Sequence, residues 1–109
     1  MTDAPDWRMY ERIAASFEID AAGMDVSVTP NAALTGSISG VKRQIDILVD
    51  ARWEEGIARR IIYDAKRRKR KIDVKDIESF EGMMRDVRAS RGVIVCSGGW
   101  TKAAENRTA

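Results

Sequence analysis

The sequence of 109 residues predicts an α/β protein in which helices flank a mixed sheet. Three observations predict this class. Apolar residues recur at helical spacing near the start of the chain, several later segments alternate or run apolar as strands do, and a glycine turn near the end introduces a further helix. In chain order these segments predict the elements α-β-β-β-α-β-α.

The first half of the chain is predicted to contain one helix and three strands. The helix covers about 5–18, where these apolar residues recur at helical spacing: Trp7, Tyr10, Ile13, Ala14 and Phe17. A strand over 25–29 alternates in polarity and is expected to stop at Pro30-Asn31. Strands over 43–49 and 57–66 follow, separated by a turn at Glu54-Glu55-Gly56.

The second half is predicted to contain a helix, a strand and a final helix. Asp73 is a suitable N-cap for a helix that ends near Ser90. The run 92–96 is short and fully apolar, which predicts a buried central strand. A turn at Ser97-Gly98-Gly99 leads into the last helix, with Thr101 as its cap. Trp100, beside the turn, either plugs the end of the sheet or stacks against a base.

Composition narrows the functional classes. The chain is 44% hydrophobic and 33% charged with a net charge of +2, which is typical of one globular domain. It has no histidine, which excludes Ser-His and Cys-His catalysis and zinc sites built on imidazole. One cysteine, Cys96, forms no internal disulfide, so a reducing cytoplasmic setting is expected. No stretch is apolar enough to predict a membrane span or a signal peptide.

The most informative segment is Asp64-Ala65-Lys66 at the end of the third predicted strand. It places a carboxylate and an ammonium two residues apart, hence on one face of the strand. If strands 43–49 and 57–66 form an antiparallel hairpin centred on position 55, Asp46 lies opposite Asp64 and Gln44 opposite Lys66, all on one face. The other face then carries apolar residues, which form a core: Ile45, Ile47, Ile61, Tyr63 and Ala65.

Two opposed carboxylates need compensation. Directly opposed residues have Cβ atoms roughly 4.5–5.5 Å apart, and like charges at that separation destabilise the pair. A divalent cation between Asp46 and Asp64 would relieve the repulsion, and oxygen ligands suit Mg²⁺. The competing interpretation is a solvated surface hairpin whose acids form ion pairs with Lys66 and nearby arginines, which would contribute little.

Charge is also concentrated directly after this segment. Positions 66–71 are six consecutive Lys or Arg residues, which favours contact with phosphates over a merely solvated connection. The basic residues predicted to bind nucleic acid are Lys42, Arg67, Arg68, Lys69, Arg70 and Lys71. The small polar loop 35–40 could approach a DNA backbone through its amides, or could simply be a connection.

These motifs together resemble the PD-(D/E)XK nuclease superfamily, and within it the Mrr-like restriction endonuclease branch. The resemblance rests on Asp46 in its apolar strand, on Asp64-Ala65-Lys66, on the basic run that precedes a helix, and on the apolar strand with its glycine turn. It covers roughly 5–105. It implies a restriction-endonuclease-like core and hydrolysis of DNA that depends on Mg²⁺, for which Mn²⁺ can substitute.

The resemblance also implies roles for individual residues. Asp46, Asp64 and the backbone carbonyl of Ala65 would bind the metal, and Lys66 would orient the attacking water and stabilise phosphate charge. Glu11, on the first helix, matches an acid that often assists at the site in this family. Asp64 stands where the Mrr-like branch more often has Glu, so this carboxylate reaches less far.

Three functions remain open at this point. The first is a Mg²⁺-dependent endonuclease acting on DNA in restriction or repair, and cutting both strands with one site per chain favours a homodimer. The second is a non-catalytic nucleic-acid-binding module that uses the basic patch Lys66–Lys71. The third is a structural or oligomerisation domain whose acids form ion pairs. The chain ends soon after the glycine turn, which fits either a minimal domain or a fragment of a longer protein.

Overall fold

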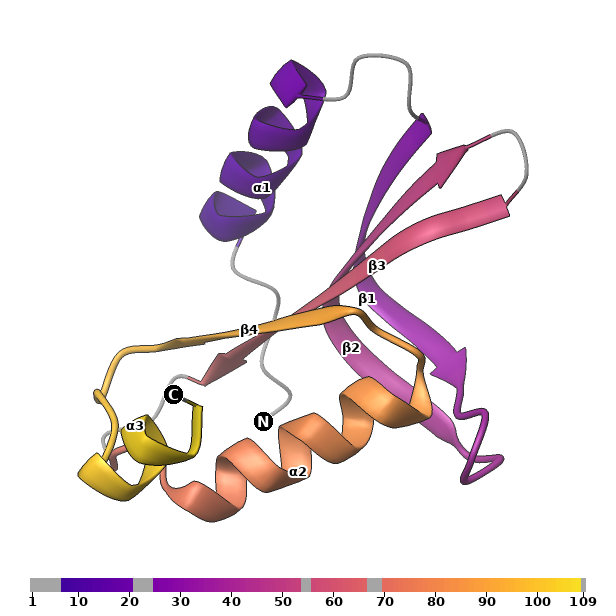
Figure 1. Cartoon of the computed structure of the whole chain (residues 1–109). Coiled ribbons are helices and arrows are strands. Elements are labelled where there is room, and N and C mark those ends of the chain that lie inside the picture. The colour runs from indigo at the N-terminus through magenta and orange to yellow at the C-terminus, as the bar shows by residue number, and fades with distance from the viewer. Residues whose placement is uncertain (1–6, 21–24, 54–55, 67–69, 109) are drawn as a thin grey trace.

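A computed structural model of the chain describes residues 7–20, 25–53, 56–66 and 70–108. The elements follow the predicted order α-β-β-β-α-β-α (Figure 1). Their bounds are α1 Trp7–Asp20, β1 Asp25–Thr35, β2 Lys42–Trp53, β3 Gly56–Lys66, α2 Val74–Asp86, β4 Arg91–Cys96 and α3 Lys102–Thr108. None of the described helices is long and apolar enough to cross a membrane.

The sheet is mixed, with strand order β1-β2-β3-β4. The first three strands pair antiparallel, and β4 pairs parallel with β3. The predicted hairpin register is confirmed from Ile47↔Tyr63 to Ala51↔Arg59, which are symmetric about position 55. Nearer the turn the register shifts at Ala51/Arg52, so that Arg52 pairs with Ile57.

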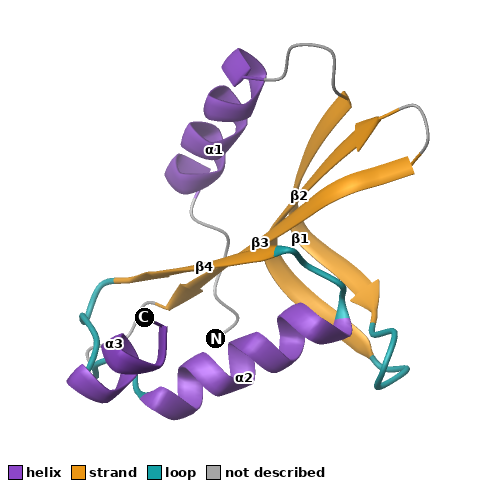
Figure 2. Ribbon diagram, viewed as in Figure 1, coloured by secondary structure: helices purple, strands orange, loops and turns teal. Residues whose placement is uncertain are grey.

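Helices cover both faces of the sheet (Figure 2), with α1 on one face and α2 on the other. Under α1, the strand residues Ile47, Val49 and Ile61 are buried against Tyr10 and Ile13. Under α2, the buried cluster is Ala32, Ile45, Leu48, Ile62, Phe80 and Val87. Because both faces of the central strands are apolar, β2 and β3 form the core of the fold.

Ile45 lies on the other face from the one predicted. Strict alternation would place it with Ile47, but it packs with Leu48 and Ile62 on the α2 side. The ladder between β1 and β2 is interrupted at this point: Pro30 pairs with Ile47 and Ala32 with Ile45, while Asn31 between them has a positive φ of 50°. The positive φ of Asn31 departs from extended strand geometry, so the strict two-residue alternation on which the prediction relied does not hold across this position.

Two further strand predictions were wrong. β1 does not stop at Pro30-Asn31 but continues to Thr35. It can do so because β1 is an edge strand, where a proline without an N–H is tolerated. β4 was expected to be central, yet it lies at the other edge of the described sheet. Its apolar run is explained by contacts on both faces, Val93 with the α1 cluster and Ile94 with the α2 cluster.

The predicted caps of both later helices are confirmed. Asp73 accepts from the backbone N–H of Val74, and Asp76 completes a capping box by accepting from the N–H of Asp73. The Thr101 hydroxyl accepts from the N–H of Ala104 at 3.1 Å. Ala104 is buried, and α3 packs against α2 through this side.

The buried carboxylate of Asp86 holds the loop between β1 and β2. It is 3% exposed and accepts from the amides of Ile38 and Ser39, both at 2.9 Å, and from Arg43 at 3.2 Å. The hydrogen bond from the Ser39 hydroxyl is the largest cause of a lowered pKa of Asp86, below the ordinary 3.8. This contact therefore stabilises the fold above that pH and weakens in acid. A Cβ at Gly36 would overlap the Asp86 carboxylate, which explains glycine there.

A buried ion pair joins β2 to β3 at a position that the register fixes. Asp50 lies opposite Arg60, and the guanidinium donates from Nε to Oδ1 at 2.8 Å and from Nη2 to Oδ2 at 3.2 Å. Arg60 also donates to the Val87 carbonyl at 2.7 Å, which ties the strands to the end of α2. The side chain of Asp50 is only 5% exposed.

Replacing Asp50 with alanine should destabilise the protein by about 3–5 kcal/mol, because Arg60 would keep a largely buried charge without its partner. Chemical denaturation followed by circular dichroism measures this change. Glu78→Ala, at an exposed position of α2, is the control and should change the free energy of unfolding by no more than about 0.5 kcal/mol. A loss below about 1 kcal/mol for Asp50→Ala, the value typical of a solvated pair, would contradict the expectation.

Candidate active site at the fork of β2 and β3

The predicted acids lie where β2 and β3 part. The ladder between these strands ends at Ile47↔Tyr63, after which β3 continues along β4 and β2 along β1 (Figure 1). Gln44 is therefore paired with Ala33 and Lys66 with Cys96, and the predicted pairing of Gln44 with Lys66 is not formed. The reason is that the two strands diverge, whereas the prediction assumed one continuous hairpin.

Asp46 occupies the first position beyond the end of the ladder. Its Oδ2 accepts a hydrogen bond from the backbone N–H of Ala65 at 2.8 Å. This side-chain bond replaces the backbone bond that a longer ladder would have made. It also brings the Asp46 carboxyl within hydrogen-bonding reach of Asp64, the residue before Ala65.

Asp64 and Lys66 form the other half of the site. The Lys66 ammonium lies 3.0 Å from Asp64 Oδ2. Both side chains are partly open to solvent, at 24% for Asp64 and 32% for Lys66. The structure thus brings Asp46, Asp64 and Lys66 together.

The electrostatics of the acid pair are unfavourable to two full negative charges. Burial is the largest influence and raises the pKa of Asp46 above its ordinary 3.8. The N–H of Ala65 acts in the opposite direction, Asp64 raises the pKa further by a hydrogen bond and by its charge, and Lys66 lowers it. The net shift is upward, so Asp46 holds a proton more readily than an isolated carboxyl does.

The other predicted site residues are placed apart from these three. Glu11 is exposed on α1, and within the described ranges no group of three or more acids or cysteines is close enough together to hold a metal. Lys42 is exposed at the start of β2, four residues before Asp46. Arg70 and Lys71 are exposed beyond β3, and Arg70 pairs with Asp76 at 3.5 Å. Arg67, Arg68 and Lys69 lie outside the described residues.

One group of candidates suggested by the sequence is occupied by other contacts, and two ion pairs were not identified from the sequence. The amides of the loop 35–40 were considered for DNA contact, but those of Ile38 and Ser39 are occupied by Asp86. The pair Asp50 and Arg60 could have been found, because it obeys the same symmetry about position 55 as Asp46 and Asp64. No sequence signal links Glu81 of α2 to Arg107 of α3, although they form an ion pair at 3.0 Å.

The element order and the mixed sheet flanked by helices define a restriction-endonuclease-like fold. A family model described as a restriction endonuclease, the Mrr catalytic domain, matches residues 3–109. The chain therefore belongs to the Mrr-type restriction endonuclease family.

The solved structures support the same fold. The crystal structure of AF1548, a protein of unknown function, matches with a TM-score of 0.62 and 14% identity. The match covers 90% of this chain and 50% of that one, so the chain spans about half the length of its structural relative. No curated protein sequence matches.

Asp46→Asn should stabilise the metal-free protein at neutral pH. The raised pKa means that the folded state binds a proton more tightly than the unfolded state, so the pair costs stability as the pH rises from 3.8 through the raised value. Asparagine removes one charge and keeps an oxygen that can accept from Ala65. Urea unfolding in EDTA, compared below and above this window, measures the effect.

The gain should therefore be larger at neutral pH than in acid. Asp25→Asn, at an exposed position of β1, controls for the loss of one negative charge. An equal gain at both pH values, or a loss at neutral pH, would show that repulsion between Asp46 and Asp64 is not the cause.

Proposed function

We propose that the domain is an endonuclease that cleaves DNA phosphodiester bonds with Mg²⁺ bound between Asp46 and Asp64. The observation that carries the proposal is the hydrogen bond from the Ala65 N–H to Asp46, which fixes one carboxylate beside the other at the fork of the sheet. Membership of a restriction endonuclease family supports nuclease activity with DNA as the substrate. The geometry supports the fork, with Asp46 and Asp64, as the location of that activity.

The donor set of the fork suits Mg²⁺. Asp46 Oδ2 and Asp64 Oδ2 are engaged by Ala65 and Lys66, which leaves the second oxygen of each carboxylate for a ligand. Mg²⁺ is commonly held by one or two carboxylates and keeps its other positions for water and phosphate oxygens. Repulsion between the acids, expressed in the raised pKa of Asp46, is the cost that such a cation would relieve.

The backbone carbonyl of Ala65 is the third proposed ligand. In an antiparallel ladder, a residue that bonds across a strand pair presents its N–H and its C=O to the same neighbour. The Ala65 N–H points to Asp46 on the β2 side, and β4 lies on the other side of β3. The carbonyl of the same residue is therefore expected to point into the fork as well. Glu11 is kept as a further ligand that would have to approach from α1.

The residues of the chain would divide the work at the phosphate. A bound divalent cation would supply activation of water and neutralisation of phosphate charge. Asp46, held by the N–H of Ala65, would present its oxygen in a fixed direction. Lys66 would keep one N–H on Asp64 and offer its others to a phosphate oxygen and to the attacking water, as a positive charge with three donors can.

DNA would approach the fork across exposed basic residues. Lys42 would contact a phosphate from the β2 side, and Arg70 and Lys71 from the β3 side. Arg67, Arg68 and Lys69 are proposed to contact DNA on the ground of the sequence alone. Cutting both strands of a duplex would require two such sites, for which we propose a homodimer.

Asp64→Asn and Lys66→Met should each lower plasmid cleavage by at least about 10²-fold, the effect of removing one group that stabilises charge in a transition state. The measurement is the rate of conversion of supercoiled to nicked and linear plasmid in Mg²⁺. Asp25→Asn, the same substitution at an exposed carboxylate, should cleave as the unchanged protein does. Equal rates in all four proteins would refute the proposed site.

Mg²⁺ should raise the melting temperature of the protein only while both acids are present. At a concentration 100 times the dissociation constant, a ligand of the folded state adds about 2.7 kcal/mol. The shift should vanish in Asp46→Asn and in Asp64→Asn and persist in Asp25→Asn. Salt-dependent DNA binding together with no Mg²⁺ shift would favour the alternative, a non-catalytic module that uses the basic patch Lys66–Lys71.

A further inference from the structure

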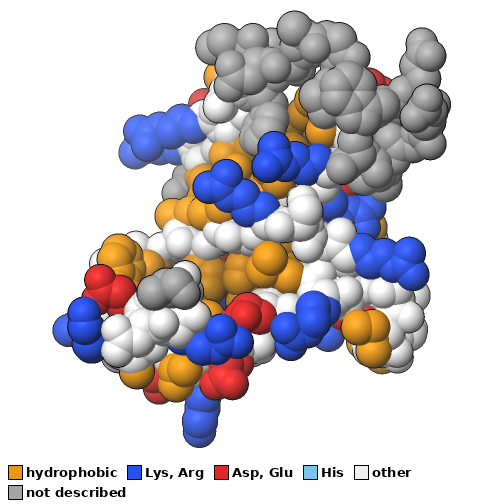
Figure 3. All heavy atoms as spheres, viewed as in Figure 1, with side chains coloured by type: hydrophobic (Ala, Val, Ile, Leu, Met, Phe, Trp, Pro, Cys, Tyr) orange, Lys and Arg blue, Asp and Glu red, His pale blue; other side chains and the backbone are white. Residues whose placement is uncertain are grey.

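A cavity of about 620 Å³ opens between α2, β4 and α3. This volume is within the range of small-molecule pockets. Its walls include Phe80 and Met84 from α2 and Ile94 and Cys96 from β4. Figure 3 shows hydrophobic side chains at the surface between β4 and α2, with charged side chains of both signs near them. None of the residues proposed to bind the metal lines this cavity.

Glu81, one of the residues that line the cavity, carries a buried acceptor that lacks a donor. Glu81 Oε2 accepts from Arg107 at 3.0 Å, but Glu81 Oε1 is buried and has no hydrogen-bond partner among the described residues. Leaving a buried acceptor unsatisfied costs free energy, so a ligand that offers an N–H at this point would be favoured. An aliphatic ligand would leave the acceptor unsatisfied, and an anion would be repelled by it.

An exposed aromatic side chain stands at the cavity. Trp100 lines it and is 59% exposed, so it does not plug the end of the sheet. Its backbone forms a bridge with Ile72, and Gly99 before it has a positive φ of 77°, a conformation that glycine adopts readily. A flat, open indole beside apolar walls is suited to stacking on a planar ligand.

The cavity adjoins the fork of β2 and β3. In the parallel ladder of β3 and β4, Asp64 pairs with Ile94 and Lys66 with Cys96. Neighbouring strands are about 4.8 Å apart, and residues paired in this way point to the same face. Ile94 and Cys96 both line the cavity, so a ligand there would lie one strand away from Asp64 and Lys66.

We propose that this cavity binds an unpaired DNA base that carries an exocyclic amino group, from the nucleotide next to the phosphate held at Lys66. The base stacks on Trp100, and its amino group donates to Glu81 Oε1, the contact by which carboxylates read the N4 amino group of cytosine. The inference rests on the proposed function, since the nucleotide is placed by the cleavage site. A base that is already unpaired enters at least cost.

Cytosine and uracil are a size-matched pair for the test. Cytosine has an amino group at position 4 and an unprotonated N3, whereas uracil has a carbonyl oxygen at position 4 and an N3–H. The probes are labelled duplexes with a single bulged deoxycytidine, deoxyuridine or abasic residue, and anisotropy in EDTA gives their dissociation constants. The unchanged protein should bind the deoxycytidine bulge about 10-fold more tightly than the deoxyuridine bulge, within the range of one specific base contact.

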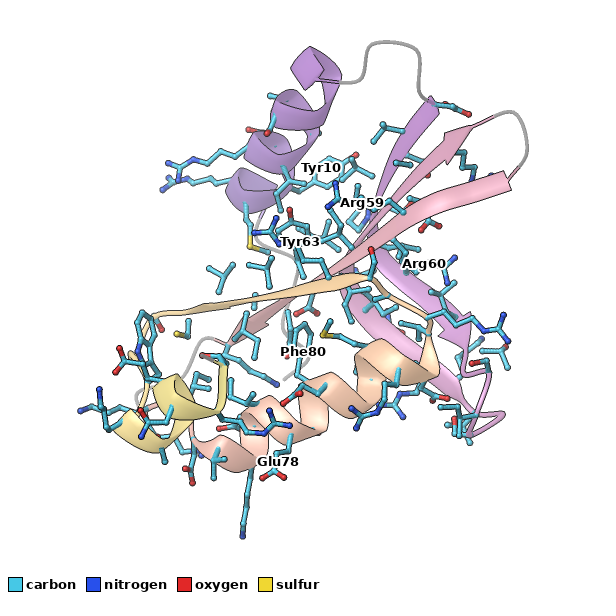
Figure 4. All side chains as sticks on the ribbon, viewed as in Figure 1. Tyr10, Arg59, Arg60, Tyr63, Glu78 and Phe80 are labelled. Carbon is cyan, nitrogen blue, oxygen red and sulfur yellow. The ribbon has the colours of Figure 1, made fainter. Side chains whose placement is uncertain are left out.

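Two substitutions assign the preference to the cavity. In Glu81→Gln the amide oxygen would remain with Arg107 and the amide nitrogen would face the cavity, so the preference should disappear or reverse toward deoxyuridine. Glu78→Gln is the matched control, because Glu78 is exposed on the same helix and points away from the sheet (Figure 4); it should keep the preference. Trp100→Ala should weaken binding of both bulged bases by about 5-fold or more, and abasic DNA little.

Equal affinities of the unchanged protein for all three bulges would overturn the inference, and this comparison needs no variant to fold. So would a preference for deoxycytidine that survives in a folded Glu81→Gln protein. Plasmid cleavage in Mg²⁺ separates this result from the proposed function. Cleavage without a bulge preference removes the cavity alone, whereas a Glu81-dependent preference without cleavage keeps the cavity and removes the nuclease.

Discussion

The end of the β2–β3 pairing and the proposed site both depend on one hydrogen bond, from the Ala65 N–H to Asp46. Where β2 and β3 part, each loses a neighbour, and the backbone groups of both strands would otherwise be left without partners in the interior. Asp46 supplies an acceptor at the first position past the ladder. The same bond that ends the sheet pairing therefore holds a carboxylate beside Asp64, so the structural need and the proposed site have one origin.

A buried ion pair next to the fork stabilises the two strands that part there. Asp50 and Arg60 join the same two strands on the other side of Ile47↔Tyr63, with the acid and the base satisfying each other. At the fork, by contrast, two acids share one lysine. The first arrangement is neutral and buried and fastens β2, β3 and α2 together. The second has two acids for one base and is partly open to solvent, which is the difference expected between a structural pair and a site that receives a cation.

The sequence predicted the parts of this fold that depend on local patterns. Asp73 and Thr101 were identifiable as caps because the motif that satisfies a helix terminus is contained in a few residues. The symmetry about position 55 placed Asp46 near Asp64 because the hairpin is local. The prediction failed at Gln44, where the partner of a strand changes, since alternation along one strand does not say which strand lies beside it. The end of β1 at Pro30 and the face of Ile45 were predicted wrongly for a related reason. Neither an edge position nor a break in alternation is evident from the sequence of one strand.

The cavity beside the fork was beyond prediction for a stronger reason. Phe80 and Met84 are spaced like any core stripe, and only the way α3 packs on α2 leaves space beside them. Glu81 reads as an ordinary polar position until Arg107, 26 residues later, takes one of its oxygens and leaves the other buried. Since β4 carries Ile94 and Cys96 alongside Asp64 and Lys66, the parallel ladder couples this space to the fork. The edge strand β4 thus lines the cavity, and its register with β3 determines how far the cavity lies from Asp64 and Lys66.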